Sequence, residues 1–238
     1  MNLSLEGIKM NERDKGILRD LELFRCMSRD QLAILHFSHL KNPVNSTNSV
    51  LKRLTRDGYI KHSNQFTPYV YFPVDSKMKE NSQKIPHFLT IVDVVIEMKT
   101  FKEPKYLMIE PKFGPKGGVE PDIFCLWYGN PILIEVQRNI YTSETIRKKI
   151  NLYEAFYHEG TWKQEPWQGI DKPRFPSILI LTTTRYPVQS DVLKINQAPS
   201  ITDFIQNLQG NEKSITPRAT TKPPAIKSNN GSISLRMK

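Results

Sequence analysis

Two apolar segments of the chain carry polar side chains at positions where a buried strand has no use for them. The segments are PDIFCLWY (121–128) and PILIEVQ (131–137), and the polar residues are Asp122, Glu135 and Gln137. Short runs rich in Ile, Val, Phe and Trp predict β-strands. An acid in such a strand needs water, a hydrogen-bond donor or a metal ion, because an unpaired buried carboxylate is costly. The chemistry of these residues therefore depends on how the two strands pair.

Gly129-Asn130 separates the two segments and predicts a two-residue hairpin turn. With these two residues as the loop, Asp122 lies opposite Gln137, and Glu135 is a diagonal neighbour of Asp122. Side chains alternate along a strand, so we expect all three polar side chains on one face of the sheet. The two carboxylates would then be within reach of a shared cation.

Two carboxylates on one face form the kind of ligand set that a hard divalent ion prefers. Asp122 and Glu135 are therefore candidate ligands for Mg²⁺ or Mn²⁺, which would polarise a phosphodiester and lower the pKa of an attacking water. Gln137 would orient that water, although a neutral amide cannot take up its proton. A purely structural interpretation stays open, because an acid that follows a proline is often a turn or cap residue. In that case the protein needs no cofactor.

The elements around the two segments predict an α/β domain. Ile91, Val94, Val95 and Met98 form one apolar side of a helix that precedes the strands. The loop at 160–176 contains two tryptophans, which would either stack on unpaired bases or pack on their own domain. The expected order is α-β-β-β-α-β, with helices at 86–102 and 143–158 and strands at 105–110, 121–128, 131–137 and 177–184.

Residues 1–74 show a different pattern, in which three short helices precede a β-ribbon. Ser28 is a good N-cap for the second helix, and Gly58 is suited to end the third. This order is typical of a winged helix-turn-helix. The helices are expected within 11–27, at 29–37 and between the polar cluster after Pro43 and Gly58, and the ribbon at 59–74.

The third helix and the ribbon supply the candidate DNA-binding residues. A recognition helix reads base edges with its N-terminal residues, while basic side chains grip phosphates. The same basic residues would form an ordinary solvated face in a protein that binds no DNA. With Val50, Leu51 and Leu54 toward the core, the candidates are Ser46, Thr47 and Asn48 for bases or phosphates, and Lys52, Arg53, Arg56, Lys61 and His62 for phosphates.

The bulk composition favours a polyanionic partner. The net charge is +10 and the pI is about 9.5, which suits nucleic acid or an acidic membrane surface. Cys26 and Cys125 are too few and too far apart for a disulfide framework or a zinc site. No apolar run approaches the about 20 residues of a membrane span, and the first residues lack the apolar core of a signal peptide. We therefore expect a cytoplasmic protein with no membrane partner.

Composition also divides the chain into four parts. The winged helix-turn-helix of 1–74 is followed by a polar linker at 75–85 and by the α/β domain at 86–209. The segment 210–238 is basic and has too few large apolar residues to order itself, so we expect a disordered tail.

The motifs and their order resemble known families. The PD that opens the second strand and the EVQ that ends the third resemble the PD-(D/E)xK nuclease superfamily. RDKGILRDLELFRCMSRDQLAILHF, VLKRLTRDGYI and PDIFCLWYGNPILIEVQRNIYTSETIRKKINLYEAFY are similar, in this order, to the replication-relaxation family of plasmids and mobile elements. The resemblance covers about 11–185. It implies a winged helix-turn-helix followed by a restriction-endonuclease-like core with a mixed sheet.

The resemblance also assigns roles to individual residues. It implies that Asp122 and Glu135 bind the metal and that Gln137 stands where the catalytic lysine usually is. Lys149, on the following helix, is the candidate to replace that lysine. The helix before the strands often contributes a further acid, for which the candidates are Glu97 and, more weakly, Glu110 at the end of the first strand.

Two functions follow, and both have double-stranded DNA as the partner. The first is a non-catalytic regulator or replication accessory of a plasmid or mobile element. Its degenerate nuclease-like domain would serve assembly with other replication or mobilisation proteins. The second is an Mg²⁺-dependent endonuclease or nickase that uses Asp122 and Glu135. The sequence leaves open whether the protein acts as a homodimer.

Overall fold

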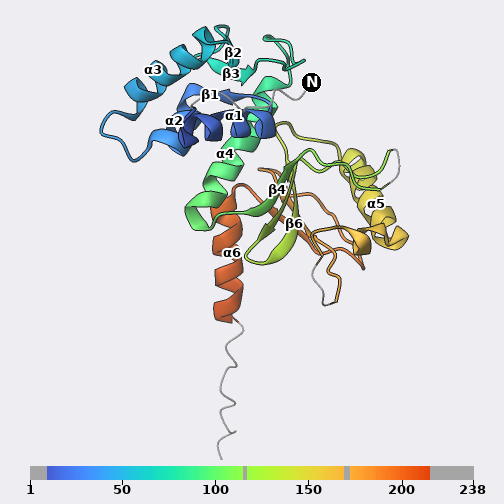
Figure 1. Ribbon diagram of the computed structural model, residues 1–238. Helices are drawn as coiled ribbons and strands as arrows, with labels where there is room; N and C mark the ends of the chain where they lie inside the picture. Colours follow the sequence, from blue (N-terminus) through green and yellow to red (C-terminus); the bar gives the residue numbers. More distant parts are fainter. Residues whose placement is uncertain (1–9, 115–116, 169–171, 215–238) are drawn as a thin grey trace, which may run out of the picture.

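The computed structural model describes residues 10–114, 117–168 and 172–214. In these ranges, six α-helices and two β-sheets form two units that meet along one long helix, α4 (Ile85–Phe101) (Figure 1). One sheet is small and antiparallel, and the other is mixed and five-stranded, which confirms the α/β class expected from the sequence. Within the described ranges, no helix has both the length and the apolar character to cross a membrane.

The N-terminal unit consists of three helices and three short strands. Its sheet has the order β1-β3-β2, and both strand pairs are antiparallel. Helices α2 and α3 pack against each other, and α1 packs on β3. The elements are α1 (Glu12–Phe24), β1 (Met27–Ser28), α2 (Arg29–Phe37), α3 (Pro43–Arg56), β2 (Ile60–Ser63) and β3 (Val70–Pro73).

Local sequence signals set the ends of these helices. Ser28 Oγ accepts the Gln31 N–H at 3.2 Å, and Gln31 Oε1 accepts the Ser28 N–H at 3.0 Å, which together form a capping box for α2. Gly58 follows α3 with φ 77°, a conformation that glycine adopts without strain. Both boundaries match the sequence prediction. The sequence predicts a chain break at Pro43 and the polar cluster after it, but α3 already begins at Pro43. A proline is tolerated there because the N–H groups of the first helical turn have no partner within the helix.

The C-terminal unit is built on the five-stranded sheet of order β4-β5-β6-β7-β8. The first three strands pair antiparallel, and the last three pair parallel. The order α-β-β-β-α-β expected from the sequence is present. Its elements after α4 are β4 (Lys105–Ile109), β5 (Ile123–Trp127), β6 (Asn130–Val136), α5 (Ser143–Glu159), the short 3₁₀ helix η1 (Thr161–Gln164) and β7 (Ser177–Leu181).

Two further elements follow that were not predicted from the sequence. Strand β8 (Ile195–Ala198) extends the sheet, and α6 (Ile201–Ser214) packs beside α4 (Figure 1). The predicted start of the disordered tail at residue 210 is therefore too early, because α6 continues to Ser214. The rest of that tail, 215–238, lies outside the described residues.

The hydrophobic core does not divide between the two units. One cluster of buried apolar residues extends from the N-terminal unit through α4 onto one face of the five-stranded sheet. A second cluster fills the space between the opposite face and α5. Polar contacts strengthen the junction, since Gln31 Nε2 donates to Asp93 Oδ1 at 2.6 Å and Arg25 pairs with Glu110 at 2.9 Å. The segment 75–85 thus separates the units along the chain, while α4 joins them in space.

The cysteines and the tryptophans of the 160–176 loop are part of this core. Cys26 and Cys125 are buried free thiols, and burial raises the pKa of each to about 12. Trp162 and Trp167 are buried in the cluster under α5. Of the two interpretations of that loop, the structure therefore supports packing on its own domain.

Candidate functional site

The hairpin that carries the acids turns one residue earlier than the expected Gly129-Asn130 loop. Tyr128 and Gly129 form the turn, with φ values of 52° and 77°, and Asn130 pairs with Trp127 as the first residue of β6. A two-residue hairpin loop of this kind needs positive φ at both central positions. The ladder now places Ile123 opposite Ile134, so its continuation puts Asp122 opposite Glu135 rather than Gln137. A shift of the partner by two residues keeps the side chains on the expected face.

Asp122 joins three elements at one edge of the sheet. Its Oδ2 accepts the backbone N–H of Val136 at 2.7 Å, which ties the start of β5 to the end of β6. Its Oδ1 lies 3.0 Å from Nε2 of His87, on the first turn of α4. The hydrogen bond that the His87 ring donates to Asp122 is the main cause that raises the pKa of His87 above its ordinary value. Both carboxylate oxygens of Asp122 therefore have partners within the protein.

Glu135 is more deeply enclosed, and α5 supplies its partners. The amine of Lys149 contacts Oε2, and the hydroxyl of Tyr153 donates to Oε1. Only 3% of the Glu135 side chain is exposed. Burial raises the pKa of Glu135 to about 7, although the positive charge of Lys149 acts in the opposite direction. The expectation that Lys149 reaches the acids from the helix agrees with this geometry.

Gln137 follows the acids at the end of β6. Its backbone N–H donates to the carbonyl oxygen of Leu181 at 3.0 Å, which holds it beside β7. Its side-chain Oε1 is buried and has no hydrogen-bond partner within the described residues. This orphaned oxygen borders the same pocket as Asp122 and Glu135.

These acids open onto a polar pocket of about 300 Å³. The pocket combines two carboxylates of the hairpin with Glu110, His87 and three cationic side chains. The three carboxylates and the three cationic side chains are equal in number, so the lining gives no strong preference for an anion. The lining consists of Gln83, Lys84, His87, Glu110, Asp122, Glu135, Val136, Gln137, Arg138, Asn139, Tyr141 and Lys149.

As arranged, this donor set does not fit a divalent cation. An ion bound by Asp122 and Glu135 would have to displace His87 from the first and Lys149 and Tyr153 from the second. A metal must compete with these bonds inside a site that already holds the ammonium group of Lys149 against Glu135. Across the part of the chain that is described, no group of three or more His, Cys, Asp or Glu is placed to hold a metal ion.

Glu97, the candidate third acid, lies elsewhere on α4. Its Oε1 accepts the Thr202 N–H at 2.9 Å and the Thr202 hydroxyl at 2.7 Å, and its Oε2 accepts the Ile201 N–H at 3.3 Å. Glu97 therefore caps α6, where a carboxylate satisfies free N–H groups and the helix dipole. The residue that α4 gives to the pocket is His87. The sequence pattern that could have identified His87 is its position four residues before Ile91, which places a titratable side chain in line with the apolar stripe of the helix.

Three of the candidate DNA-binding residues have bonding partners within the fold. Thr47 is buried, and its hydroxyl donates to the Pro43 carbonyl at 2.7 Å, so it belongs to the core side of α3. Arg53 forms an ion pair with the buried Asp14 of α1. Lys61 donates to the carbonyl oxygen of Ser76 at 2.6 Å and holds β2 against the following segment. Helical spacing alone does not show which partners a neighbouring element will offer.

Four of the remaining candidates line one groove between α3 and the β2–β3 hairpin. These are Asn48, Lys52 and Arg56 from α3 and His62 from β2, and the groove has a volume of about 580 Å³. Ser46, on the first turns of α3, is half-buried and does not belong to this lining. The other lining residues are Arg29, Thr55, Thr67, Pro68, Tyr69 and Tyr71.

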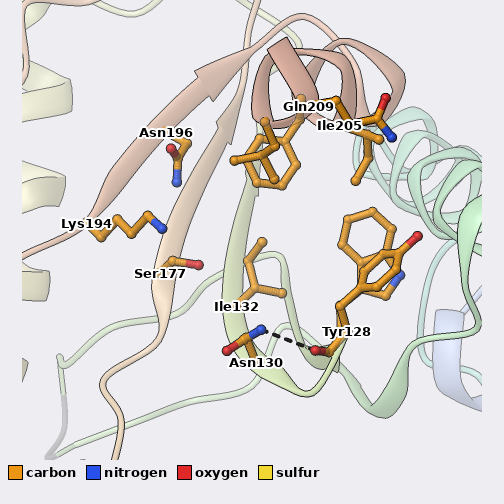
Figure 2. Close-up of a pocket in the computed structure, with 11 residues that line it drawn as sticks. Tyr128, Asn130, Ile132, Ser177, Lys194, Asn196, Ile205 and Gln209 are labelled. Carbon is orange, nitrogen blue, oxygen red and sulfur yellow. Dashed lines mark hydrogen bonds between the residues drawn. The ribbon is translucent and has the colours of Figure 1, made fainter. Parts of the chain in front are cut away.

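A third pocket, of about 400 Å³, lies at the opposite end of β6. Figure 2 shows Ile205 and Gln209 of α6 across from Tyr128 and Ile132, with Ser177, Lys194 and Asn196 along the neighbouring strands. One wall is apolar and the other is polar. It shares no lining residue with the acid pocket or the α3 groove.

Comparisons with protein-family models, with curated proteins and with solved structures gave no match to this chain.

Proposed function

We propose that the protein binds double-stranded DNA through its N-terminal unit, as a regulator or replication accessory protein of a plasmid or mobile element. The observation that carries the proposal is the α3 groove, where Asn48, Lys52, Arg56 and His62 converge from two elements. Basic and amide side chains gathered along one helix and an adjoining ribbon suit phosphate and base contacts. The net charge of +10 adds a general attraction to a polyanion.

The element order supports a winged helix-turn-helix. Helix α1, strand β1, helices α2 and α3 and the β2–β3 hairpin follow one another as that motif requires, with β1 completing the small sheet. Helix α3 would enter the major groove, and the hairpin would be the wing. Asn48 and Lys52 are exposed on α3, while Leu51 and Leu54 hold the helix to the core. This division of faces is what a recognition helix needs.

The C-terminal unit, in this proposal, is a nuclease-like domain that no longer cuts DNA. Its two acids are bonded to His87, Lys149, Tyr153 and a backbone N–H, so their oxygens already have partners within the protein. The domain would then serve assembly with other replication or mobilisation proteins, as the resemblance to the replication-relaxation family suggests.

A second candidate function is a metal-dependent DNA endonuclease or nickase. The observation that favours it is the contact between Lys149 and Glu135, because it brings a lysine to the acids although Gln137 occupies the usual position. Cutting would require Glu135 to exchange its two protein partners for a metal ion.

Salt-dependent binding tests the proposal. Fluorescence anisotropy would follow a labelled duplex across a salt series for the wild type and Lys52→Ala. The slope of log K against log salt is negative, and the loss of one phosphate contact makes it shallower by about 0.9. The matched control is Lys194→Ala, which removes an exposed lysine from the third pocket and should leave the slope unchanged. Equal slopes for all three proteins would contradict the assignment of α3, and no binding of any duplex would contradict the function itself.

A further inference from the structure

The groove beside α3 contains an aromatic stack on the hairpin. The rings of His62 and Tyr69 lie 5.2 Å apart between centroids, with an angle of 9° between their planes. The ring of Tyr71 lies 5.9 Å from His62 in a tilted orientation. His62 covers one face of the Tyr69 ring, yet Tyr69 is 47% exposed. A flat aromatic surface therefore faces the groove at the end of an existing stack.

Cationic and neutral side chains line this surface, and two of the cations have acidic neighbours: Arg29 pairs with Asp30 at 2.8 Å, and Arg56 pairs with Asp57 at 2.9 Å. Arg29, Lys52 and Arg56 line the groove, and its lining contains no Asp or Glu among the residues that the structure describes. The hydroxyl oxygen of Thr55, also in the lining, is buried and lacks a hydrogen-bond partner within the described ranges. The Thr55 oxygen is covered by protein, so what the site offers to a ligand is a ring face and positive charge.

A nucleobase with its phosphate matches all of these features. Bases stack on aromatic side chains whatever their sequence, and the cations neutralise the phosphates on either side. A paired base inside a duplex has both faces covered by its neighbours. A free face for Tyr69 is found at an unpaired position, in a single-stranded extension or on the outer side of the end pair of a duplex.

We infer that the hairpin stacks an unpaired base on Tyr69, so that the preferred partner is a DNA duplex that continues into a single strand. The inference rests on the proposed function, because α3 supplies the duplex contacts beside the stack. Helix α3 would hold the double-stranded part, and His62 and Tyr69 would hold the first unpaired base. The protein would thereby select a junction rather than an uninterrupted duplex.

Binding to matched DNAs tests the inference. Anisotropy would compare a blunt duplex with the same duplex carrying a single-stranded extension, and 2-aminopurine at the first unpaired position would report stacking. We expect the wild type to bind the extended duplex about tenfold more tightly and to quench the 2-aminopurine. Tyr69→Leu should lose the preference and the quenching, while Tyr69→Phe should retain both. The control is Tyr128→Leu, since Tyr128 is 48% exposed at a distant turn and should behave as the wild type.

The outcomes separate the inference from the proposed function. Equal wild-type affinity for blunt and extended duplexes would overturn the inference and leave duplex binding in place. A loss of affinity in Tyr69→Leu that is the same for both DNAs would overturn it too, because stacking on an unpaired base acts on the extended duplex alone. If Tyr69→Phe lost as much as Tyr69→Leu, the hydroxyl and not the ring face would be responsible. Failure to bind any DNA would remove both proposals.

Discussion

Glu135 makes the stability of the protein depend on pH in a direction that is unusual for an acid. Its carboxyl is enclosed by Lys149 and Tyr153, and burial raises its pKa from 4.5 to about 7. Between pH 4.5 and about pH 7, Glu135 therefore keeps its proton in the folded protein but has lost it in the unfolded chain. Stability must fall as the pH rises through this window, and the full cost is present above the folded pKa.

The size of the effect follows from the shift. A difference between 4.5 and about 7 corresponds to a cost on the order of 3 kcal/mol at neutral pH. For a chain of 238 residues this lowers the melting temperature by about 6–12 °C. Glu135→Gln cannot ionise and should not show this loss. The pKa of His87 is raised by the hydrogen bond that its ring donates to Asp122, and this effect acts in the same direction in both proteins and cancels in the comparison.

Thermal unfolding of wild type and Glu135→Gln between about pH 5 and pH 8 measures this difference. The two proteins should have similar stability at the acidic end, and the variant should be the more stable at the basic end. Glu144→Gln is the control, because Glu144 is an exposed carboxylate on the same helix, where it pairs with Lys148. Its pH profile should follow the wild type. Parallel profiles for wild type and Glu135→Gln would show that the Glu135 carboxyl stays ionised throughout, and would refute the reasoning.

Two further predictions concern the acids on α4 and on the hairpin. Supercoiled plasmid incubated with the wild type and Mg²⁺ or Mn²⁺ should stay intact in an agarose gel, since protein groups hold both acids. Nicking that EDTA stops and that Asp122→Asn/Glu135→Gln lacks would establish the nuclease instead. Glu97→Gln should lower the free energy of unfolding by about 1 kcal/mol in urea titrations, because Glu97 caps α6. A stability equal to that of the wild type would show that the cap contributes nothing.

The sequence predicts most elements correctly because their signals are local. The capping box at Ser28, the glycine after α3 and the apolar runs of β5, β6 and β7 each depend on neighbours within a few residues. Strand β8 was missed because INQA is short and largely polar, with only its alanine fully buried.

The candidate site was predicted in part, and the errors have a common physical cause. Asp122, Glu135 and Lys149 border one pocket because strand alternation and helical spacing carry over from sequence to structure. Glu97 and Arg53 have partners from α6 and α1, which no local sequence pattern identifies. The hairpin register moved because Tyr128 adopts a positive φ that its residue type does not favour.

The shared use of α4 has a consequence for the evolution of this chain. A helix that is exposed on one side tolerates substitution there, but α4 packs against the N-terminal unit along one side and against the sheet along another. Asp93 and His87 add polar bonds to α2 and to the hairpin, respectively. The N-terminal unit is therefore not an interchangeable module. A lineage that replaced it with another unit would have to rebuild the surface of α4 at the same time, so the two units must change together.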